Sequence, residues 1–423
     1  MKKMKDKCHV HLSLVTCLTN NSNTFNYNIR GFKLEEMNIS EGLYFIRNNN
    51  YKIKTIAQHS EIQTEKGEEL LFRIRKSKNN NFTIENPICN IEKTKNGISN
   101  LTNKLWYILS NKNTNNNIED YILNKNDIIQ FGESKYEIIE KHIEEKDKNG
   151  EDKKDIDKNG EDKKDIDKNG ENNNNNINYV DLKDKYNIIK NNKSESIFKN
   201  ITIKNIDYSN KNTDNLCRIC FEGSSSIDNP KIILCNCHDY IHYECLKSWI
   251  KTKIIKRENA KKTVVSYNIK KFICEVCLKT YPFKFTISEL NKEYSLIDLH
   301  YPIGYKYIVL ESLGLVLDNN DNVISKLIHI VKLTGDNIII GRKDYCDIAI
   351  MGNNVSREHA IIKYTNGDVF LENKSETLNT LVLVKRPIVI KENKIDLQVG
   401  RTIITANLIN NENIKENIIL DFD

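Results

Sequence analysis

CRICFEG (residues 217–223), CNCHDYIHYECLKSWI (235–250) and FICEVC (272–277) contain seven cysteines and one histidine in four close pairs. Thiolate sulfur and neutral imidazole nitrogen are ligands that zinc prefers, and four of them usually hold one structural zinc ion in a tetrahedron. Eight ligands therefore predict two zinc ions, bound by Cys217, Cys220, Cys235, Cys237, His242, Cys245, Cys274 and Cys277. Because few apolar residues lie between the pairs, we expect metal binding to supply most of the folding free energy of this segment.

One histidine competes for a ligand position. His238 lies in the short gap between Cys237 and His242. It is a rival ligand, although His242 with Cys245 has the more suitable spacing.

The residues around these ligands resemble the RING-CH (RING-variant) finger of ubiquitin ligases. The resemblance implies a cross-brace, in which the first and third pairs hold one zinc ion and the second and fourth pairs hold the other. It also implies that the finger binds a ubiquitin-conjugating enzyme and has no catalytic residue of its own. Ile219, Trp249 and Pro282 would line the groove for that enzyme; the alternative is that Ile219 and Trp249 form the small core of the finger. Leu278 stands where many active RING ligases have a cation, which leaves the strength of the ligase activity open.

The gap between Cys245 and Cys274 is long and basic, with cations at Lys247, Lys251, Lys253, Lys256, Arg257, Lys261 and Lys262. A basic run of this kind can contact nucleic acid or an acidic protein. The more common interpretation is a solvated insertion, and we expect that here.

A second motif lies near the C-terminus, in NIIIGRKDYCDIAIMGNNVSREHAIIKY (337–364). It is similar to the core of forkhead-associated (FHA) domains, which are β-sandwiches that bind phosphothreonine. The resemblance assigns phosphopeptide contacts to Arg342, Ser356, Arg357 and Thr380, and a supporting role to His359. A phosphate has a charge of about −1.5 to −2 and three acceptor oxygens, which suits arginine and hydroxyl donors. Leu378 stands where the family has the asparagine that holds the peptide backbone, and a leucine side chain cannot make those hydrogen bonds.

The first third of the chain alternates apolar and polar residues in short runs separated by asparagine-rich turns, which favours a β-sandwich. Its last run, YILNKNDIIQFGESKYEII (121–139), resembles the closing strands of an FHA domain, whereas the phosphate-binding residues are missing. The sequence thus predicts a mainly β protein, with two FHA-like sandwiches flanking a small zinc-stabilised α/β finger. The predicted segments are a degenerate FHA-like sandwich (25–141), a linker (142–212), the finger (213–284), a connector (285–324) and the FHA domain (325–411).

The linker contains a ten-residue repeat, DKNGEDKKDI, which begins at Asp147. Its low hydrophobicity cannot offset the entropy of ordering, so we expect low-complexity, disordered chain. The oxygen spacing of a calcium loop is not met.

Composition and cysteine usage restrict the partners and the cellular compartment that we expect for the protein. The 423 residues have a net charge of +6, with acids and bases both abundant, so a nucleic-acid partner is not indicated. No apolar run approaches the roughly 18 residues that span a bilayer, and thiol ligands need a reducing compartment. We expect a soluble protein of the cytoplasm or nucleus. Cys8, His9, His11 and Cys17 form at most a weak additional metal cluster.

The leading hypothesis is a RING-CH-type ubiquitin-protein ligase that docks phosphorylated partners through its C-terminal FHA domain. The alternative is a reader or scaffold without enzymatic activity. The same order of ligands occurs in PHD fingers, which bind histone tails, and Phe272 stands where that family has an aromatic residue.

Overall fold

The protein is described by a computed structural model covering residues 8–18, 31–57, 65–79, 81–87, 101, 104–109, 120–143, 201–203, 206–207, 215–237, 239–270, 274–277, 279, 281–313, 316–317, 323–352, 354–375 and 378–409. Within these ranges the chain is mainly β-strand, and α2 (Tyr243–Lys251) is the one helix. Four features of the sequence lie outside the described residues: the ten-residue repeat, His238, Phe272 and Leu278.

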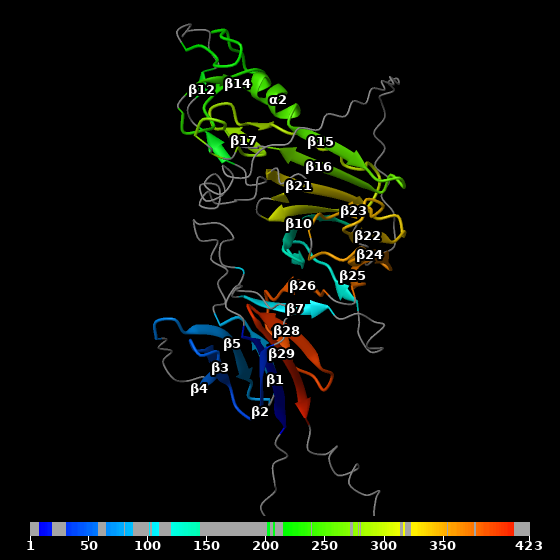
Figure 1. The fold of residues 1–423 in the computed structure, drawn as a ribbon. Helices are drawn as coiled ribbons and strands as arrows, with labels where there is room; N and C mark the ends of the chain where they lie inside the picture. The colour runs from blue at the N-terminus through cyan, green and yellow to red at the C-terminus, as the bar shows by residue number, and fades with distance from the viewer. Residues whose placement is uncertain are drawn as a thin grey trace, which may run out of the picture.

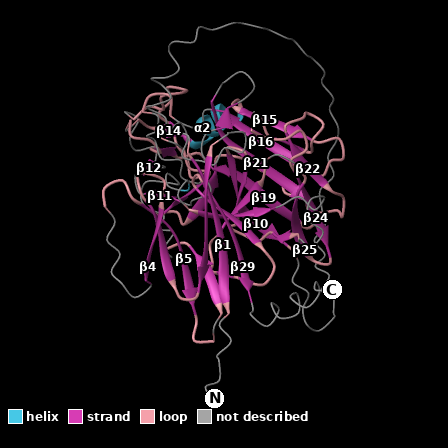
Figure 2. Cartoon of the chain, turned by 60° about the horizontal axis from the view of Figure 1, so that its bottom comes forward, coloured by secondary structure: helices cyan, strands magenta, loops and turns pink. Residues whose placement is uncertain are grey.

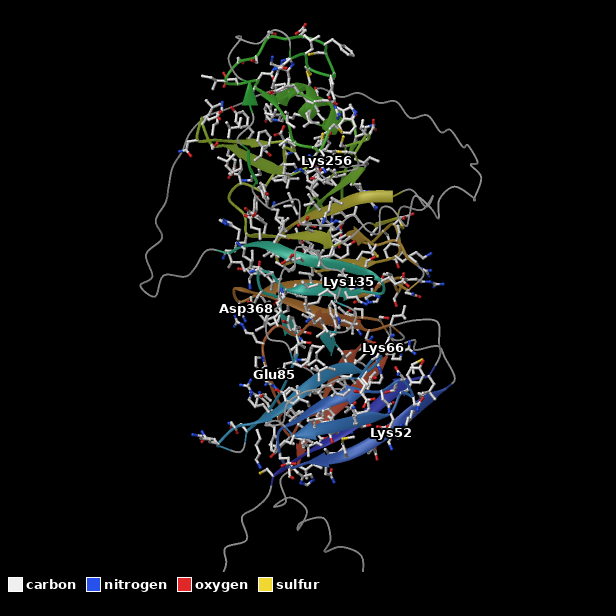
Figure 3. The ribbon with its side chains drawn as sticks, turned by 90° about the vertical axis from the view of Figure 1, so that its left-hand side faces the viewer. Lys52, Lys66, Glu85, Lys135, Lys256 and Asp368 are labelled. Atoms are coloured by element: carbon white, nitrogen blue, oxygen red, sulfur yellow. The ribbon has the colours of Figure 1, made fainter. Side chains whose placement is uncertain are left out.

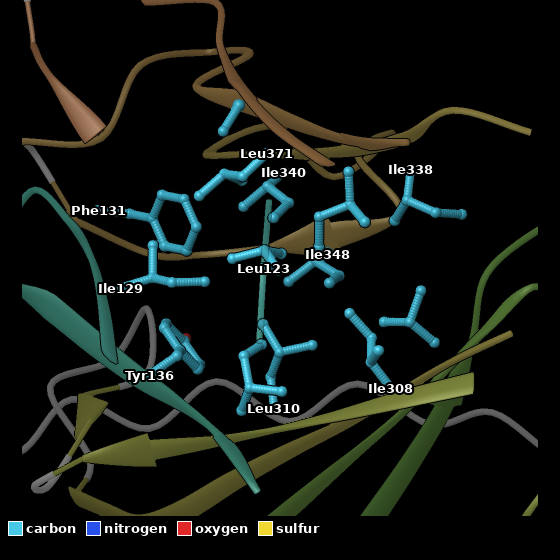
Figure 4. Close-up of a cluster of buried hydrophobic side chains, with 14 of the residues drawn as sticks. Leu123, Ile129, Phe131, Tyr136, Ile308, Leu310, Ile338, Ile340, Ile348 and Leu371 are labelled. Carbon is cyan, nitrogen blue, oxygen red and sulfur yellow. The ribbon is translucent and has the colours of Figure 1, made fainter. Parts of the chain in front are cut away.

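One sandwich contains the FHA-like motif. Its smaller sheet has the strand order β23 (Ile348–Ala349), β22 (Ile338–Gly341), β24 (Ala360–Thr365), β25 (Asp368–Asn373) and β8 (Tyr121–Ile122). The facing strands belong to the largest sheet and run β21 (Val323–Lys332), β19 (Tyr307–Leu313), β10 (Ser134–His142), β9 (Ile128–Phe131) and β26 (Thr380–Leu383); β20 (Val316–Leu317) pairs with β21 off this path. One buried cluster joins the two layers, with Ile340 and Leu371 on one side and Ile129, Tyr136 and Leu310 on the other (Figure 4).

A second sandwich lies below the first in Figure 1 and repeats its strand order. Its smaller sheet runs β4 (Ile53–Ala57), β3 (Leu43–Arg47), β5 (Glu69–Lys76), β6 (Phe82–Glu85) and β27 (Ile388–Val389). Facing it are β7 (Leu105–Leu109), β28 (Ile395–Val399), β29 (Thr402–Ile409), β1 (His9–Cys17) and β2 (Phe32–Ile39). Strands β7 and β26 pair with each other, from Leu109 opposite Thr380 to Trp106 opposite Leu383, and join both sandwiches in one 13-stranded sheet.

The two sandwiches exchange their last three strands. Strands β8 to β10, from the N-terminal third, close the sandwich that contains β19 to β26. In return, β27 to β29 from the C-terminus close the sandwich that contains β1 to β7. The structure therefore differs from the expected self-contained sandwiches at 25–141 and 325–411, because each stretch completes the core of the other. The period-2 alternation that predicted the strands leaves the pairing partner open.

The finger is built onto the same large sheet (Figure 2, with α2 in cyan beside β15 and β16). Leu246 and Ile250 of α2 share a buried cluster with Tyr267, Ile328 and Ile330 of the sheet. The basic insertion forms a hairpin, β15 (Ile254–Glu258) and β16 (Val264–Lys270), whose second strand pairs with β21. The insertion is therefore part of the sheet and not a free loop.

Short strands complete the finger and correct two predicted boundaries. They are β11 (Ile201–Ile203), β12 (Ile206–Asp207), β13 (Lys231–Ile232), β14 (Ile241–His242), β17 (Lys284–Ile287) and β18 (Lys292–Ser295). Strands β11 and β12 fall inside the predicted linker and pair with β17 and β13. The predicted connector 285–324 supplies β18 and β19, so it belongs to the finger and the first sandwich.

Two other expectations concern the N-terminus and the membrane. His9–Cys17 forms strand β1, directly after Cys8, and His11 bonds Asn38 on the neighbouring strand, with 3.1 Å between Nδ1 and Oδ1. Among the described residues, the two clusters that can hold a metal are both in the finger. No described helix has the length and apolar character needed to cross a membrane.

Candidate metal centre and phosphate-binding end

The structure brings the eight predicted ligands together in two groups of four. One group is Cys217, Cys220, His242 and Cys245; the other is Cys235, Cys237, Cys274 and Cys277. Within each group the ligand atoms all lie within 4.8 Å of one another. Alternate pairs of the sequence thus meet, as the cross-brace requires. Four sulfur and nitrogen donors at this spacing suit a tetrahedral divalent metal such as zinc.

His242 is oriented by a backbone carbonyl. Its Nδ1 lies 3.2 Å from Cys220 Sγ and 3.8 Å from Cys245 Sγ. Its Nε2 hydrogen-bonds the carbonyl oxygen of Ser224. That bond places the proton on Nε2 and leaves the Nδ1 lone pair for a metal, which is the usual second-shell arrangement for a ligating histidine. His242 directly precedes α2, and Cys245 follows three residues later in the first turn of that helix.

Backbone N–H groups and one arginine favour thiolates in both groups. Cys217 Sγ accepts N–H bonds from Ile219 and His242, each at 3.4 Å. Burial raises the pKa of the Cys274 thiol, but backbone N–H groups and the Arg218 guanidinium, 3.6 Å away, outweigh burial and lower that pKa to about 5. In contrast, burial and the neighbouring thiols raise the pKa of Cys237 to about 12. A bound divalent cation would relieve this crowding of thiolates.

The predicted groove residues differ in exposure. Ile219 is 39 % exposed. Trp249 is half-buried, with its ring edge-on to Tyr281 and the Lys253 ammonium 5.2 Å from its centre. Pro282 is buried, so its surface is already covered within the chain.

Sequence reasoning missed two apolar side chains that are more exposed than any of the predicted ones. Phe221 follows Cys220 directly and is 73 % exposed, and Val276 precedes Cys277 and is 74 % exposed. These two side chains, beside candidate metal ligands, belong to the surface of the finger rather than to its core. The C-x-x-C spacing could have indicated them, because it forces a tight turn in which both ligands point toward the metal.

Arg342 and Ser356 lie in adjacent loops at one end of the first sandwich. We call them the Arg342 loop (residues 342–347) and the Ser356 loop (351–359). The N–H of Arg342 donates to the carbonyl of Ser356 at 2.9 Å, which joins the loops. A Cβ atom on Gly341 would lie 2.2 Å from the carbonyl oxygen of Arg357, so only glycine permits this approach. The side chains of Arg342 and Arg357 are exposed beside the half-buried Ser356.

His359 supports the Ser356 loop from inside the sandwich. It is fully buried, and its Nδ1 accepts the N–H of Ser356 at 3.1 Å. Burial lowers the pKa of His359 to about 4, so the ring is neutral near pH 7 and Nδ1 stays an acceptor. The ring also packs edge-on against Phe131, which comes from the exchanged strand β9. The hydrogen bond between His359 and Ser356 is consistent with the supporting role predicted for His359.

Ser375 contacts the Ser356 hydroxyl, whereas the predicted residue Thr380 points into the fold. Thr380 is fully buried and donates to Asn373 Oδ1 at 2.9 Å, so its hydroxyl is used inside the fold. Ser375 was not singled out in the sequence, yet its Oγ lies 2.5 Å from Ser356 Oγ and accepts the N–H of Leu378. Ser375 therefore orients the Ser356 hydroxyl. Neither loop motif contains Ser375, so only the packing of β25 beside the Ser356 loop reveals it.

In the second sandwich, the arginine at the end of β3 is held inside the fold. Strand β3 holds the position of β22 in the strand order, and Arg47 is its last residue. Arg47 is buried, pairs with Glu69 and donates to Thr402 Oγ1 at 2.8 Å. The guanidinium of Arg47 is thus already paired with the carboxylate of Glu69 from the same sandwich.

Comparison with family models assigns two parts of the chain. Residues 217–277 match the RING-variant domain, and residues 338–404 match the FHA domain. Both family resemblances drawn from the sequence are therefore confirmed. No curated protein and no solved structure matches the chain. The FHA match continues into β28 and β29, although here those strands close the other sandwich.

Proposed function

We propose that this protein is a RING-CH-type ubiquitin-protein ligase whose FHA domain docks partners that contain phosphothreonine. The finger would bind two zinc ions and recruit a ubiquitin-conjugating enzyme charged with ubiquitin. Cysteine ligands must stay reduced, so we further propose the cytoplasm or nucleus as its compartment. The observation that supports the proposal best is the shared core of the finger and the FHA sheet.

Through this shared core, the proposed surface for the conjugating enzyme and the proposed phosphopeptide surface would belong to one rigidly packed unit. Ile250 of α2 packs with Ile328 and Ile330 of β21, and the other face of β21 lines the core of the FHA sandwich through Leu327 and Val331. A conjugating enzyme on the finger and a phosphorylated partner at the Arg342 and Ser356 loops would be held at a constant separation. Such positioning is the way in which a ligase without catalytic residues can accelerate transfer.

Ligase activity is tested by autoubiquitination of the full chain with a panel of conjugating enzymes. Ile219→Ala should abolish or strongly reduce the signal, because the side chain faces solvent between two metal ligands. Ile227→Ala is the matched control, since Ile227 is 54 % exposed in the same finger but is not next to a ligand. Equal activity of both variants would contradict the groove assignment.

Phosphothreonine binding is tested with a degenerate phosphothreonine peptide library. Arg342→Ala and Ser356→Ala should each weaken binding about tenfold or more, as expected for the loss of a charge-assisted hydrogen bond to phosphate. Arg386→Ala removes an exposed arginine elsewhere in the same half of the chain and should leave binding unchanged. Strong binding of histone peptides, together with no detectable autoubiquitination, would instead favour the alternative of a PHD-like reader.

A further inference from the structure

The basic hairpin of the finger docks against the Arg342 loop (Figure 1, β15 and β16 beside β23). The Arg257 guanidinium donates to the carbonyl of Asp344 at 2.5 Å. Asn259 donates to Asp347 Oδ1 at 2.6 Å, and the Lys261 ammonium lies 3.8 Å from Asp347 Oδ2. The insertion between the sixth and seventh metal ligands therefore forms the border of the candidate phosphate-binding end.

Strand geometry directs Arg257 toward this end. Arg257 lies opposite Ser266, which bonds His329 on the FHA side of the sheet. Its neighbour Lys256 lies opposite Tyr267, whose ring belongs to the core of the finger. Because successive side chains of a strand point to opposite faces, Arg257 faces the FHA loops while Lys256, labelled in Figure 3, faces the finger.

The charges at this border are unbalanced. Arg342, Lys343 and Arg357 come from the FHA loops, and all three are exposed, as is Arg257. Asp347 is already paired with Lys261 and also accepts the N–H of Ile339 at 2.9 Å. The acids that remain in these loops are Asp344 and Glu358. These four cations exceed the two acids, so the surface favours an anionic ligand.

Arg257 is also held in place. A guanidinium has five N–H donors, and the bond from one of its terminal nitrogens to the Asp344 carbonyl restrains the side chain, which stays exposed. A donor that is already ordered loses less conformational entropy when it binds an oxyanion. Arg257 therefore combines a restrained side chain with N–H donors that remain for an anionic ligand.

We propose that the finger supplies one wall of the phosphopeptide-binding surface, and that Arg257 selects phosphothreonine peptides with a second acidic group, either a carboxylate or another phosphate. This inference rests on the proposed phosphothreonine binding and specifies its ligand class. Arg257 would then belong to the finger in sequence and to the phosphopeptide surface in space.

The test uses the full zinc-loaded chain and one phosphothreonine peptide chosen from the library, synthesised with acidic or with alanine residues around the phosphothreonine. The native protein should bind the acidic form about tenfold more tightly, the size expected for one charge-assisted contact. Arg257→Ala should remove that preference and leave the affinity for the alanine form within about twofold. Lys256→Ala, on the opposite face, should keep the preference. Circular dichroism and zinc content establish that both variants are folded.

The outcomes separate the two proposals. If the native protein binds neither peptide, phosphothreonine docking itself is wrong. If it binds both equally, or if Arg257→Ala keeps the preference, docking stands and the role of Arg257 is overturned. A third outcome is that Arg257→Ala and Lys256→Ala both weaken the binding of both peptides and of a random single-stranded oligonucleotide to the same extent. The hairpin would then be a general polyanion-binding surface, and the proposed selectivity is again overturned.

Discussion

The side-chain amide of Asn354 donates a hydrogen bond of 3.0 Å to the carboxylate of Glu133, although 221 residues separate them in the chain. Glu133 lies in the turn between the exchanged strands β9 and β10, and Asn354 lies in the Ser356 loop. A segment of the N-terminal third thus supports a loop that is assigned to phosphate binding. The exchange of strands is therefore part of how the candidate site is formed.

Gly132 gives a direct test of that exchange. It has a φ of 59°, and a Cβ atom there would lie 2.2 Å from the carbonyl oxygen of Asn354. We expect Gly132→Ala to lower the free energy of unfolding by about 1–3 kcal/mol and to weaken phosphopeptide binding by shifting the Ser356 loop. Gly335→Ala is the control, since Gly335 also has a positive φ but has open space around it. If β9 and β10 closed their own third of the chain instead, Gly132→Ala would leave phosphopeptide binding unaltered.

Metal removal should unfold more than the finger. The core of the finger includes Tyr267, Ile328 and Ile330 of the large sheet, so loss of metal should also loosen β16 and β21. We expect two zinc ions per chain by elemental analysis, and increased hydrogen exchange in 264–270 and 323–332 after chelation. Cys220→Ser should reproduce that effect, whereas Cys8→Ser, outside both ligand groups, should not. A chain that exchanges equally slowly with and without metal would show that metal binding is not coupled to the sheet.

His329 should make the protein sensitive to acid. Burial lowers the pKa of His329 to about 4, below its ordinary value near 6.5. A folded-state pKa below the unfolded one means that protons favour the unfolded chain. The stabilisation is thus complete above about pH 6.5 and is lost as the pH falls toward 4. His329→Gln cannot bind this proton and should lose less stability between pH 7 and pH 4.5, with a difference on the order of 3 kcal/mol.

Urea unfolding at several pH values measures this difference, and His11→Gln on the surface of β1 serves as the control. If the native chain and His329→Gln lose the same stability on acidification, His329 is not the cause of the acid sensitivity.

A buried ion pair joins two strands of the FHA sheet. Glu311 of β19 and Lys326 of β21 have a carboxylate-to-ammonium distance of 3.2 Å, with exposed side-chain fractions of 0 % and 3 %. Glu311→Gln would leave the Lys326 charge buried without its counter-charge, which typically costs about 3–5 kcal/mol. The exposed pair Lys292–Asp228 is the control, because solvent screens it and Asp228→Asn should leave the denaturant midpoint nearly unchanged. Denaturant midpoints compare the two, and similar small losses would show that solvent reaches the Glu311 site.

The sequence by itself determined the local features of this protein. The spacing of Cys217 to Cys277 defined the eight ligands, and the resemblance to RING-CH fingers supplied the pairing that the structure brings together. The motif from Gly341 to His359 located the two loops, because a glycine turn and a loop hydroxyl act within a few residues of each other. Such features depend on chain geometry over short distances, which sequence spacing describes directly.

Only the tertiary structure decided which strands meet. Alternating apolar residues make a strand with one buried face, but that pattern fits any partner with a matching face. The sequence could therefore not place Phe131 against His359, turn Thr380 inward, or set Arg257 beside Asp344. Each of these contacts joins segments far apart in the chain, and its geometry follows from packing the whole sheet rather than from any local preference.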